Sequence, residues 1–330
     1  MRISIAMATY NGEKYLQEQL DSFLKQTCLP DELIVSDDCS NDNTVQILKN
    51  FTNYAPFEVK IYKNERNLGY AANFENALKQ TSGNIIFLSD QDDVWFPNKI
   101  EYVIKIAQQN DQYLLYTNDA EICLADGTST GLTKLGQTLS LGLSEKDFTA
   151  GCCMAIRKEL KDIALPIPTK FYGHDHWLDK LSNILEAKKV IPSVLQLYRR
   201  HGENTSSWIV SCTKKQTLVD LIIYKLTYNG NPSLELDQLN SEIDALSAII
   251  NSPLITDSMR EKINREIHEC KVKELIRKKR LKIQAMPHIH RIRYVLRLLL
   301  LGDYKYYSGW QSAIKDLVSK SRSLGQPRKN

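Results

Sequence analysis

Three carboxylates within four consecutive residues are the most distinctive chemical feature of the sequence. Asp90, Asp92 and Asp93 follow a short apolar run at residues 85–88. The run is rich in β-branched and aromatic residues, which predicts a strand buried in a parallel sheet. Side chains just past such a strand lie at the carboxyl edge of the sheet, where open α/β folds bind ligands. Neighbouring acids repel one another and their oxygens suit Mn²⁺ or Mg²⁺, so we predict a metal site rather than a solvated acidic turn.

A second candidate site lies at residues 173–177, which read Gly-His-Asp-His-Trp. A helical pattern begins there, and a helix N-terminus favours a carboxylate such as Asp175. The two histidines could ligate zinc, but no third or fourth ligand is in reach. From the residues alone, Asp175 is either an ordinary N-terminal helix acid or a functional group.

A third candidate site is a basic stretch that begins at residue 198. Arg199, Arg200 and His201 follow one another in a predicted glycine-containing loop. Arginine suits bidentate contacts with phosphate, so the two arginines form either a diphosphate clamp or an exposed basic turn. His201 is in addition a candidate metal ligand.

The first hundred residues alternate between strand and helix patterns, and this alternation would position the sites. Strands are predicted at residues 3–8, 33–35, 59–62 and 85–88, and helices at 13–26, after the N-caps at 40–42, and around 74–78. Such βαβ units with right-handed crossovers form a parallel sheet. The strands end in polar residues, which predicts a lined cleft at one sheet edge: Thr9, Asn11, Asp37, Asp38, Asn64 and Asp90. Neither a dinucleotide fingerprint nor a P-loop is present, which argues against a dehydrogenase and a P-loop kinase.

The remainder of the chain changes character twice. A helix is predicted from residue 99 to about 110, and strands near 113–116 and at 149–156. Residues 130–143 are rich in Gly, Ser and Thr and are predicted to form a mobile loop over the cleft. Beyond residue 208 glycine becomes scarce and helical periodicity dominates to the end.

Composition limits the class of protein. The 330 residues carry a net charge of +4, with 42% apolar and 25% charged residues, as in an ordinary globular protein. The seven cysteines show no CxxC spacing, so neither a disulfide framework nor a zinc site is expected. We find neither a signal peptide nor an apolar run of ~18 residues, and we therefore expect a cytoplasmic location.

The charge is concentrated in one C-terminal segment. Residues 271–301 contain ten Lys or Arg and one acid, Glu274, interleaved with apolar residues. Such a segment is either a solvated helix face or a surface for an anionic membrane. Nucleic acid is not expected as a partner, because no DNA- or RNA-binding motif accompanies the charge.

Four segments together resemble the nucleotide-sugar half of inverting glycosyltransferases of family two, which have the GT-A fold. The segments are ATYNGEKYLQEQLDSFLKQT, ELIVSDDCSNDNT, NERNLGYAANFENAL and FLSDQDDVWFPNKI. The resemblance implies an α/β fold with a mostly parallel, Rossmann-like sheet flanked by helices. It divides the chain into a nucleotide-sugar half at 1–98, an acceptor half at 99–208 and a helical region at 209–330. It is strongest with bacterial rhamnosyltransferase-like members that build cell-surface polysaccharide.

The resemblance assigns roles to individual residues. Asp38 would contact the nucleoside, the acids from Asp90 onward would bind the metal and the sugar diphosphate, and Asp175 would be the catalytic base. Asn73 departs from the family, which often has Arg there. The implied donor-binding set is Ala8, Thr9, Tyr10, Asn11, Glu13, Asp38, Asn67, Asp90, Gln91, Asp92, Arg199 and Arg200, and the implied Mn²⁺ or Mg²⁺ ligands are Asp92, Asp93 and His201.

The expected reaction moves a sugar from a UDP- or dTDP-sugar, with dTDP-rhamnose one candidate, to a glycan or lipid-linked oligosaccharide. The product would be O-antigen or capsular polysaccharide. Two alternatives stay open: a non-catalytic nucleotide-sugar-binding protein on the same scaffold, and a metal-dependent nucleotidyltransferase. The presence of Asp90, Asp92 and Asp175 argues against a non-catalytic binding protein. The released product distinguishes the two enzymes, because a glycosyltransferase releases nucleoside diphosphate and a nucleotidyltransferase releases pyrophosphate.

Overall fold

A computed structural model describes residues 1–171, 173–202, 204, 209–227 and 232–318. Its strands are β1 (Ile3–Thr9), β2 (Glu32–Asp37), β3 (Glu58–Lys63), β4 (Ile85–Ser89), β5 (Val94–Trp95), β6 (Leu115–Leu124), β7 (Ser129–Thr133), β8 (Met154–Arg157) and β9 (Lys188–Arg200). Its α-helices are α1 (Leu16–Leu24), α2 (Thr44–Thr52), α3 (Tyr70–Gln80), α4 (Lys99–Gln109), α5 (Lys134–Ser140), α6 (Lys158–Ala164), α7 (His174–Ile184), α8 (Leu218–Thr227), α9 (Pro232–Ile249), α10 (Asp257–Ala285), α11 (His288–Leu300) and α12 (Trp310–Val318). Short 3₁₀ turns lie at Glu145–Asp147, Gly151–Cys153, Ile209–Ser211 and Asp303–Tyr306.

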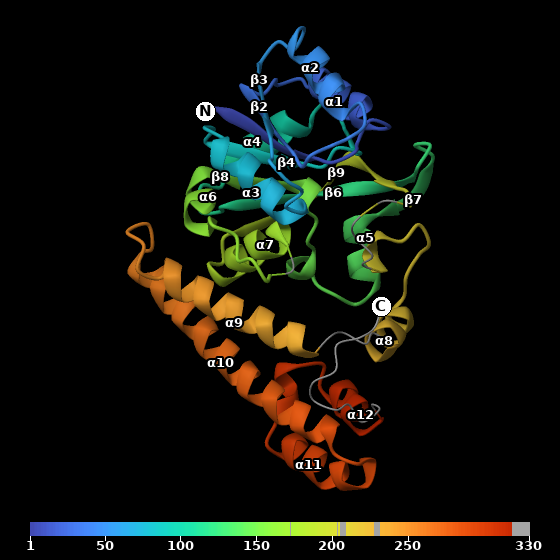
Figure 1. The fold of residues 1–330 in the computed structure, drawn as a ribbon, viewed down its shortest axis with the longest axis vertical. Coiled ribbons are helices and arrows are strands. Elements are labelled where there is room, and N and C mark those ends of the chain that lie inside the picture. Colours follow the sequence, from blue (N-terminus) through green and yellow to red (C-terminus); the bar gives the residue numbers. More distant parts are fainter. Residues whose placement is uncertain (172, 203, 205–208, 228–231, 319–330) are drawn as a thin grey trace.

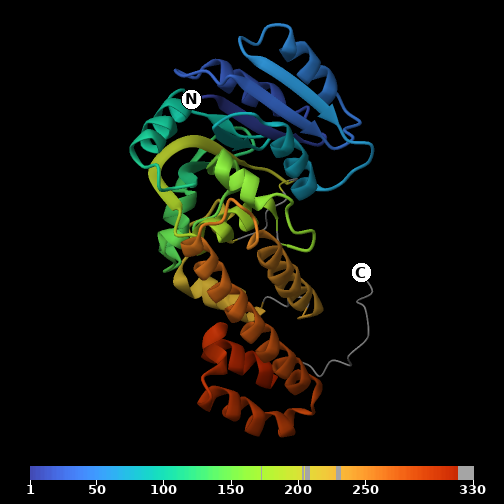
Figure 2. The same cartoon turned by 90° about the vertical axis from the view of Figure 1, so that its left-hand side faces the viewer.

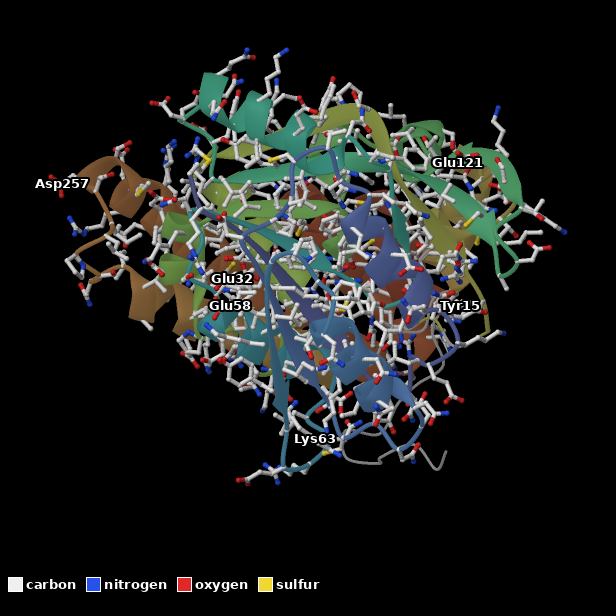
Figure 3. The ribbon with its side chains drawn as sticks, turned by 90° about the horizontal axis from the view of Figure 1, so that it is seen from above. Tyr15, Glu32, Glu58, Lys63, Glu121 and Asp257 are labelled. Carbon is white, nitrogen blue, oxygen red and sulfur yellow. The ribbon has the colours of Figure 1, made fainter. Side chains whose placement is uncertain are left out.

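One mixed sheet organises the molecule, with helices on both faces (Figure 1). The strand order is β3-β2-β1-β4-β8-β6-β9-β5, and β7 pairs with β6. The four N-terminal strands pair in parallel, which confirms the predicted βαβ units. In the second half β8 pairs antiparallel with both β4 and β6, and only β6 and β9 pair in parallel. Seen from above, Glu32 and Glu58 lie side by side where β2 and β3 begin, and Lys63 lies at the opposite end of β3 (Figure 3).

The sheet separates two apolar cores, because alternate residues of a strand point to opposite faces. Ile5, Met7 and Phe87 pack with α1, α2 and α4 on one face. Ile86 and Leu88 pack with α3, α6 and α7 on the other, where α9 and α10 also contribute apolar side chains. This double burial explains why the sequence at β4 is continuously apolar and shows no alternation.

The prediction of a mobile loop at residues 130–143 was wrong. The segment forms strand β7 and helix α5, and the side chain of Thr133 caps the helix by accepting a hydrogen bond from the Gly136 amide (3.0 Å). Leu135 and Thr138 are buried. Packing and the cap therefore override the weak helix propensity of Gly, Ser and Thr.

Two further boundaries differ from the sequence prediction. The predicted strand at 149–156 is a 3₁₀ turn at Gly151–Cys153 followed by β8. Arg199 and Arg200 are the last residues of β9 rather than part of a loop. Residues 203 and 205–208 of that predicted loop lie outside the described part of the chain.

The C-terminal region is helical, as predicted. Helices α9 and α10 lie side by side and pack against the part of the chain that contains the sheet, while α11 and α12 lie at the end of the molecule farthest from the sheet (Figures 1 and 2). Lys180 of α7 joins the two parts through Glu242 of α9 (2.7 Å) and Glu266 of α10 (2.8 Å). Among the described residues, none of the helices is long and apolar enough to cross a membrane.

Candidate active site

A cleft of about 1350 Å³ opens at the carboxyl ends of β1, β2 and β4. Its opposite wall comes from α5, α7 and the turn before β8, so both halves of the sheet contribute. Most residues implied as donor or metal ligands line it: Ala8, Thr9, Tyr10, Asn11, Asp38, Asn67, Asp90, Gln91, Asp92, Asp175 and His201. Glu13, Asp93, Arg199 and Arg200 do not line it.

Asp38 holds the loop that follows β3. Its carboxylate accepts hydrogen bonds from the backbone amides of Leu68 (2.8 Å) and Gly69 (2.9 Å) and from the side-chain amide of Asn64 (2.9 Å). Gly69 has φ 84°, a conformation that favours glycine. Asp38 therefore fixes the rim of the cleft at the end where the resemblance expects the nucleoside.

Asn73 explains why the missing family arginine does not leave a gap. It is buried, donates to the carbonyl of Thr9 (3.1 Å) and accepts from Asn64 (3.0 Å). The side chain thus ties the end of β1 to the start of α3. Any phosphate contact that an arginine would supply there must come from elsewhere in the cleft.

Gln91 joins the two loops on either side of the cleft floor. Its side-chain amide donates to the carbonyl of Tyr10 (3.0 Å) and accepts from the Tyr10 amide (2.9 Å). A Cβ atom on Gly12 would lie 2.3 Å from the Gln91 oxygen, so a larger residue there would displace the Gln91 side chain from its bonds to Tyr10. Glu13 binds the backbone and side chain of Asn43 outside the cleft (2.9 and 2.7 Å), and it shapes the loop rather than facing a ligand.

The three acids after β4 divide into different environments. Burial, Asp92 and Asp93 raise the pKa of Asp90 well above its ordinary value, and burial and Asp92 raise the pKa of Asp93 to about 7. Asp93 accepts from Gln196 (2.9 Å) and from the Arg199 amide (3.2 Å) beneath the cleft floor. Asp90 and Asp93 lie close enough to Cys152 for the three groups to share a metal ion.

Asp92 and His201 form a second pair of candidate metal ligands. The Nε2 atom of His201 lies 2.7 Å from an Asp92 carboxylate oxygen, and Asn204 approaches the same oxygen at 3.4 Å. The two residues are far apart in sequence, and β9 brings His201 back to the loop after β4. The structure thus brings Asp92 and His201 together, and their role as metal ligands with Asp93 stays a prediction.

The structure does not support Arg199 as a diphosphate clamp. Its guanidinium is buried, donates to the carbonyls of Asp92 (3.1 Å) and Ala125 (3.0 Å), and pairs with Glu18 (2.5 Å). These contacts occupy all three nitrogens in holding the acidic loop in place. Arg200 lies outside the cleft lining as well.

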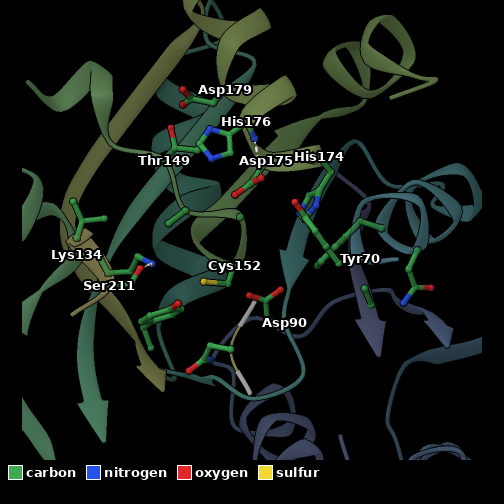
Figure 4. Close-up of a pocket in the computed structure, with 18 of the residues that line it drawn as sticks. Tyr70, Asp90, Lys134, Thr149, Cys152, His174, Asp175, His176, Asp179 and Ser211 are labelled. Atoms are coloured by element: carbon green, nitrogen blue, oxygen red, sulfur yellow. Dashed lines mark hydrogen bonds between the residues drawn. The ribbon is translucent and has the colours of Figure 1, made fainter. Parts of the chain in front are cut away.

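Asp175 lies in the first turn of α7 and points into the cleft with Asp90, next to His174 (Figure 4). The His176 amide donates to its carboxylate (2.9 Å). Burial opposes the charge of Asp175, but His174, His176 and this amide outweigh it, so the pKa of Asp175 lies below its ordinary value. The carboxylate is therefore ionised at neutral pH and able to accept a proton.

Two glycines allow the backbone to pass close to Asp175. A Cβ atom on Gly151 would lie 3.1 Å from Nε2 of His174 and 3.2 Å from Cβ of Asp175. A Cβ atom on Gly173 would lie 2.8 Å from the Asp175 carboxylate and 3.0 Å from the Tyr70 hydroxyl. The start of α7 is therefore held tightly between the turn before β8 and the start of α3.

Asp179, one turn further along α7, has a structural role. It pairs with Lys188 (2.5 Å) and accepts from Asn183 (3.0 Å). Lys188 also donates to the carbonyls of Lys146 (2.9 Å) and Phe148 (2.7 Å), so the pair anchors α7 to the chain before β8. Asp175 is therefore better placed than Asp179 to act as a base.

Two buried lysines near the acid cluster have no recognisable signal in the sequence, and of the two only Lys134 lines the cleft. Lys134 of α5 lies over the ring of Tyr198 (3.6 Å), and Lys99 lies over Trp95 (3.9 Å) and donates to the Cys152 carbonyl (3.1 Å). Burial lowers the pKa of Lys99 to about 8. A single lysine in a Gly- and Thr-rich stretch, or at a helix start, looks like any surface lysine, whereas Tyr70 could have been found because it directly follows the Gly69 turn.

Comparison with known proteins identifies the class. A model of the family described as "Glycosyl transferase family 2" matches residues 4–163. The match confirms the resemblance for residues 4–163, which form a family 2 glycosyltransferase region, and the fold is of the GT-A type.

Individual relatives show how far the likeness extends. The glucosyltransferase WfgD of Escherichia coli is 37% identical over 35% of this chain and 45% of its own length. The dTDP-rhamnosyl transferase RfbG of Shigella flexneri is 30% identical over 46% and 54%, so the chain matches about half the length of these relatives. The crystal structure of S. aureus TarS residues 1–349 with UDP-GlcNAc covers 96% of this chain and 90% of that chain at 19% identity, with a TM-score of 0.57. At this identity TarS establishes the shared fold.

Proposed function

We propose that the chain is a metal-dependent inverting glycosyltransferase that uses a nucleoside-diphosphate sugar. The observation that carries the proposal is one cleft in which an ionised Asp175 faces Asp90, with the Asp92–His201 pair on the same floor. A base on one side and a metal-binding acid cluster on the other are what sugar transfer from a diphosphate requires.

The donor set fits a divalent cation. Burial, and after it repulsion from neighbouring acids, raises the pKa values of Asp90 and Asp93, and a bound cation would offset both effects. Asp92 and His201 supply an oxygen and a nitrogen that lie 2.7 Å apart. With the neighbouring carboxylates the set is rich in oxygen, which suits Mn²⁺ or Mg²⁺. When bound, such a cation stabilises negative charge on a departing diphosphate. We propose Asp92 and His201 as its ligands, with Asp90 and Asp93 completing the acidic environment.

Asp175 would act on the acceptor. Its carboxylate takes the proton of an acceptor hydroxyl while the hydroxyl oxygen forms a bond to the anomeric carbon of the donor sugar. The bond from that carbon to the diphosphate oxygen breaks, and its electron pair leaves with the nucleoside diphosphate. Attack and departure on opposite faces invert the anomeric centre. His174 and Tyr70 flank the carboxylate and would orient the acceptor.

The relatives suggest the donor and acceptor classes. WfgD is named for UDP-glucose and a diphosphoundecaprenol-linked acceptor, and RfbG for a dTDP-rhamnosyl donor. We propose a UDP- or dTDP-sugar as donor, dTDP-rhamnose among the candidates, and a lipid-linked oligosaccharide of a cell-surface polysaccharide such as O-antigen or capsule as acceptor. Such an acceptor would bring the protein to the cytosolic face of the inner membrane. We further propose residues 1–208 as the catalytic unit and 209–330 as the unit that positions it.

Replacement of Asp175 by Asn tests the proposal, because Asn keeps the shape and cannot take the proton. We expect donor affinity with Mn²⁺ to stay within a few fold and nucleoside-diphosphate release to fall by on the order of 10²-fold or more. Asp179→Asn is the comparison: it should lower thermal stability through loss of the Lys188 pair. Transfer at wild-type rates by Asp175→Asn would refute the assignment, and release of pyrophosphate from a nucleoside triphosphate would indicate a nucleotidyltransferase instead.

A further inference from the structure

Helix α11 carries an apolar stripe that faces away from the protein. Ile289, Ile292, Leu296 and Leu300 are exposed, with 79% of Ile289 and 90% of Leu300 accessible to solvent. Their spacing of three, four and four residues places them on one face of a helix. The opposite face is different: Arg291, Val295 and Leu298 are buried against α10 and α12. A helix that only covers a core has polar residues on its outer face. The outer face of α11 is instead apolar.

The arginines of α11 divide between the two faces. Arg291 is fully buried and donates to the carbonyls of Gln284 (2.7 Å), Met286 (2.8 Å) and Asp316 (3.0 Å), so it joins the ends of α10 and α12. Arg293 and Arg297 are exposed beside the apolar stripe, one turn apart. In the described part of the chain neither pairs with a carboxylate, and α11 itself contains no acid.

The structure also shows that several basic residues of the segment 271–301 are buried or paired with acids. Arg280 is buried and pairs with Asp316 (2.8 Å), and Arg277 is buried and pairs with Glu235 (2.6 Å). Lys279 pairs with Asp303 (3.2 Å). These residues hold the C-terminal helices together or are already neutralised. Among the described residues of α11, the exposed Arg293 and Arg297 keep their charge uncompensated beside the apolar stripe.

We infer that the outer face of α11 is a docking surface for an anionic lipid bilayer. The apolar stripe would enter the acyl boundary while Arg293 and Arg297 contact anionic headgroups, as in helices that lie in the plane of a membrane. Self-association is the competing explanation. A twofold dimer through this face would place the same patch, with its arginines, on both subunits, and like charges would oppose it. The position of α11 at the end of the molecule leaves the face open to a flat surface (Figures 1 and 2).

The inference gains its biological sense from the proposed lipid-linked acceptor, but its test needs neither donor nor acceptor. The full chain would be sedimented with vesicles of phosphatidylcholine and phosphatidylglycerol, and with vesicles of phosphatidylcholine alone. We expect binding to the anionic vesicles that weakens as salt is raised. Arg293→Gln with Arg297→Gln should weaken it by roughly 30-fold, since each basic residue near an anionic surface contributes about fivefold.

A second pair of substitutions tests the apolar contribution. Leu296→Gln with Leu300→Gln should lower binding by about tenfold or more per leucine. Leu124→Gln with Leu254→Gln, exposed leucines elsewhere on the surface, is the matched control and should bind like the wild type. Melting curves would confirm that all variants fold, which is expected because the replaced side chains are exposed.

Three results would overturn the inference: no binding of the wild type to anionic vesicles, unchanged binding of both α11 variants, or a wild-type dimer that the leucine substitutions convert to a monomer in light scattering. Turnover of a soluble acceptor is measured on the same proteins. Loss of vesicle binding with normal turnover is the result expected of the α11 variants. Vesicle binding by a wild type without sugar transfer would refute the proposed function alone.

Discussion

His174 is buried beside the proposed base without a hydrogen-bond partner, and its protonation should govern stability in weak acid. The ring is 4% exposed and stacks on Phe74 with 3.9 Å between centroids, and neither ring nitrogen has a partner. Burial lowers the pKa of His174 to about 4, whereas an unfolded histidine titrates near 6.5. Between these values the unfolded chain binds more protons than the folded one, so stability falls as pH falls from about 6.5 towards 4.

The size of this effect follows from the two pKa values. From about pH 7.5 to about pH 5, His174 alone should reduce the free energy of unfolding by about 2 kcal/mol. His174→Leu removes the titrating group and two unsatisfied nitrogens, so the variant should lose about 2 kcal/mol less than the wild type over this range. Urea denaturation at the two pH values measures the difference.

A matched control separates His174 from the other histidines. His268→Leu replaces an exposed histidine of α10 and should leave the wild-type pH dependence unchanged. Sugar transfer by His174→Leu should fall about tenfold or more, because His174 lines the cleft directly beside the proposed base Asp175. An identical pH dependence in His174→Leu and the wild type would refute the assignment of a buried neutral ring.

Three other substitutions test separate parts of the structure. Asp92→Asn should weaken Mn²⁺-dependent donor binding by about 10- to 100-fold in calorimetry, and unchanged binding would remove Asp92 from the ligand set. Arg280→Met leaves Asp316 buried without its cation and should cost about 3–5 kcal/mol in urea denaturation, against less than about 0.5 kcal/mol for the exposed Lys282→Met. Gly151→Ala should lower turnover while the melting temperature changes little, because the added methyl group would contact His174 and Asp175 at the start of α7. Unaltered turnover would show that the turn before β8 can move away from α7 without affecting the site.

The nucleotide-sugar half could be predicted from the sequence because its signals are local. Each buried parallel strand is a short apolar run, and its polar end follows within one or two residues, so the chain order alone places Asp38 and Asp90 at one sheet edge. The pairing of β1 with β2 and β4 confirms that placement. The departure at Asn73 was visible too, although its role in tying β1 to α3 needed the structure.

The acceptor half could not be predicted to the same extent because its geometry depends on distant contacts. Arg199 looks like a phosphate ligand in the sequence, but its guanidinium pairs with Glu18, which lies 181 residues earlier in the chain. Helix α5 has weak intrinsic propensity and is held by the Thr133 cap and by burial. A pattern of neighbouring residues does not contain information of either kind.

The arrangement of the cleft implies that binding of the proposed donor and metal would join the two halves of the sheet. Asp92 follows β4 in the nucleotide-sugar half, whereas His201 follows β9, the last strand of the acceptor half. The hydrogen bond between them already closes this gap, and Arg199 reinforces it through the Asp92 carbonyl. The proposed base, Asp175, lies on α7, and α7 contacts β9, the strand that precedes His201. A shift of His201 would therefore also move Asp175 relative to the donor. We therefore propose that the buried contacts of Arg199 and Asp179 position the site, because they would set the distance between the acid cluster and the proposed base.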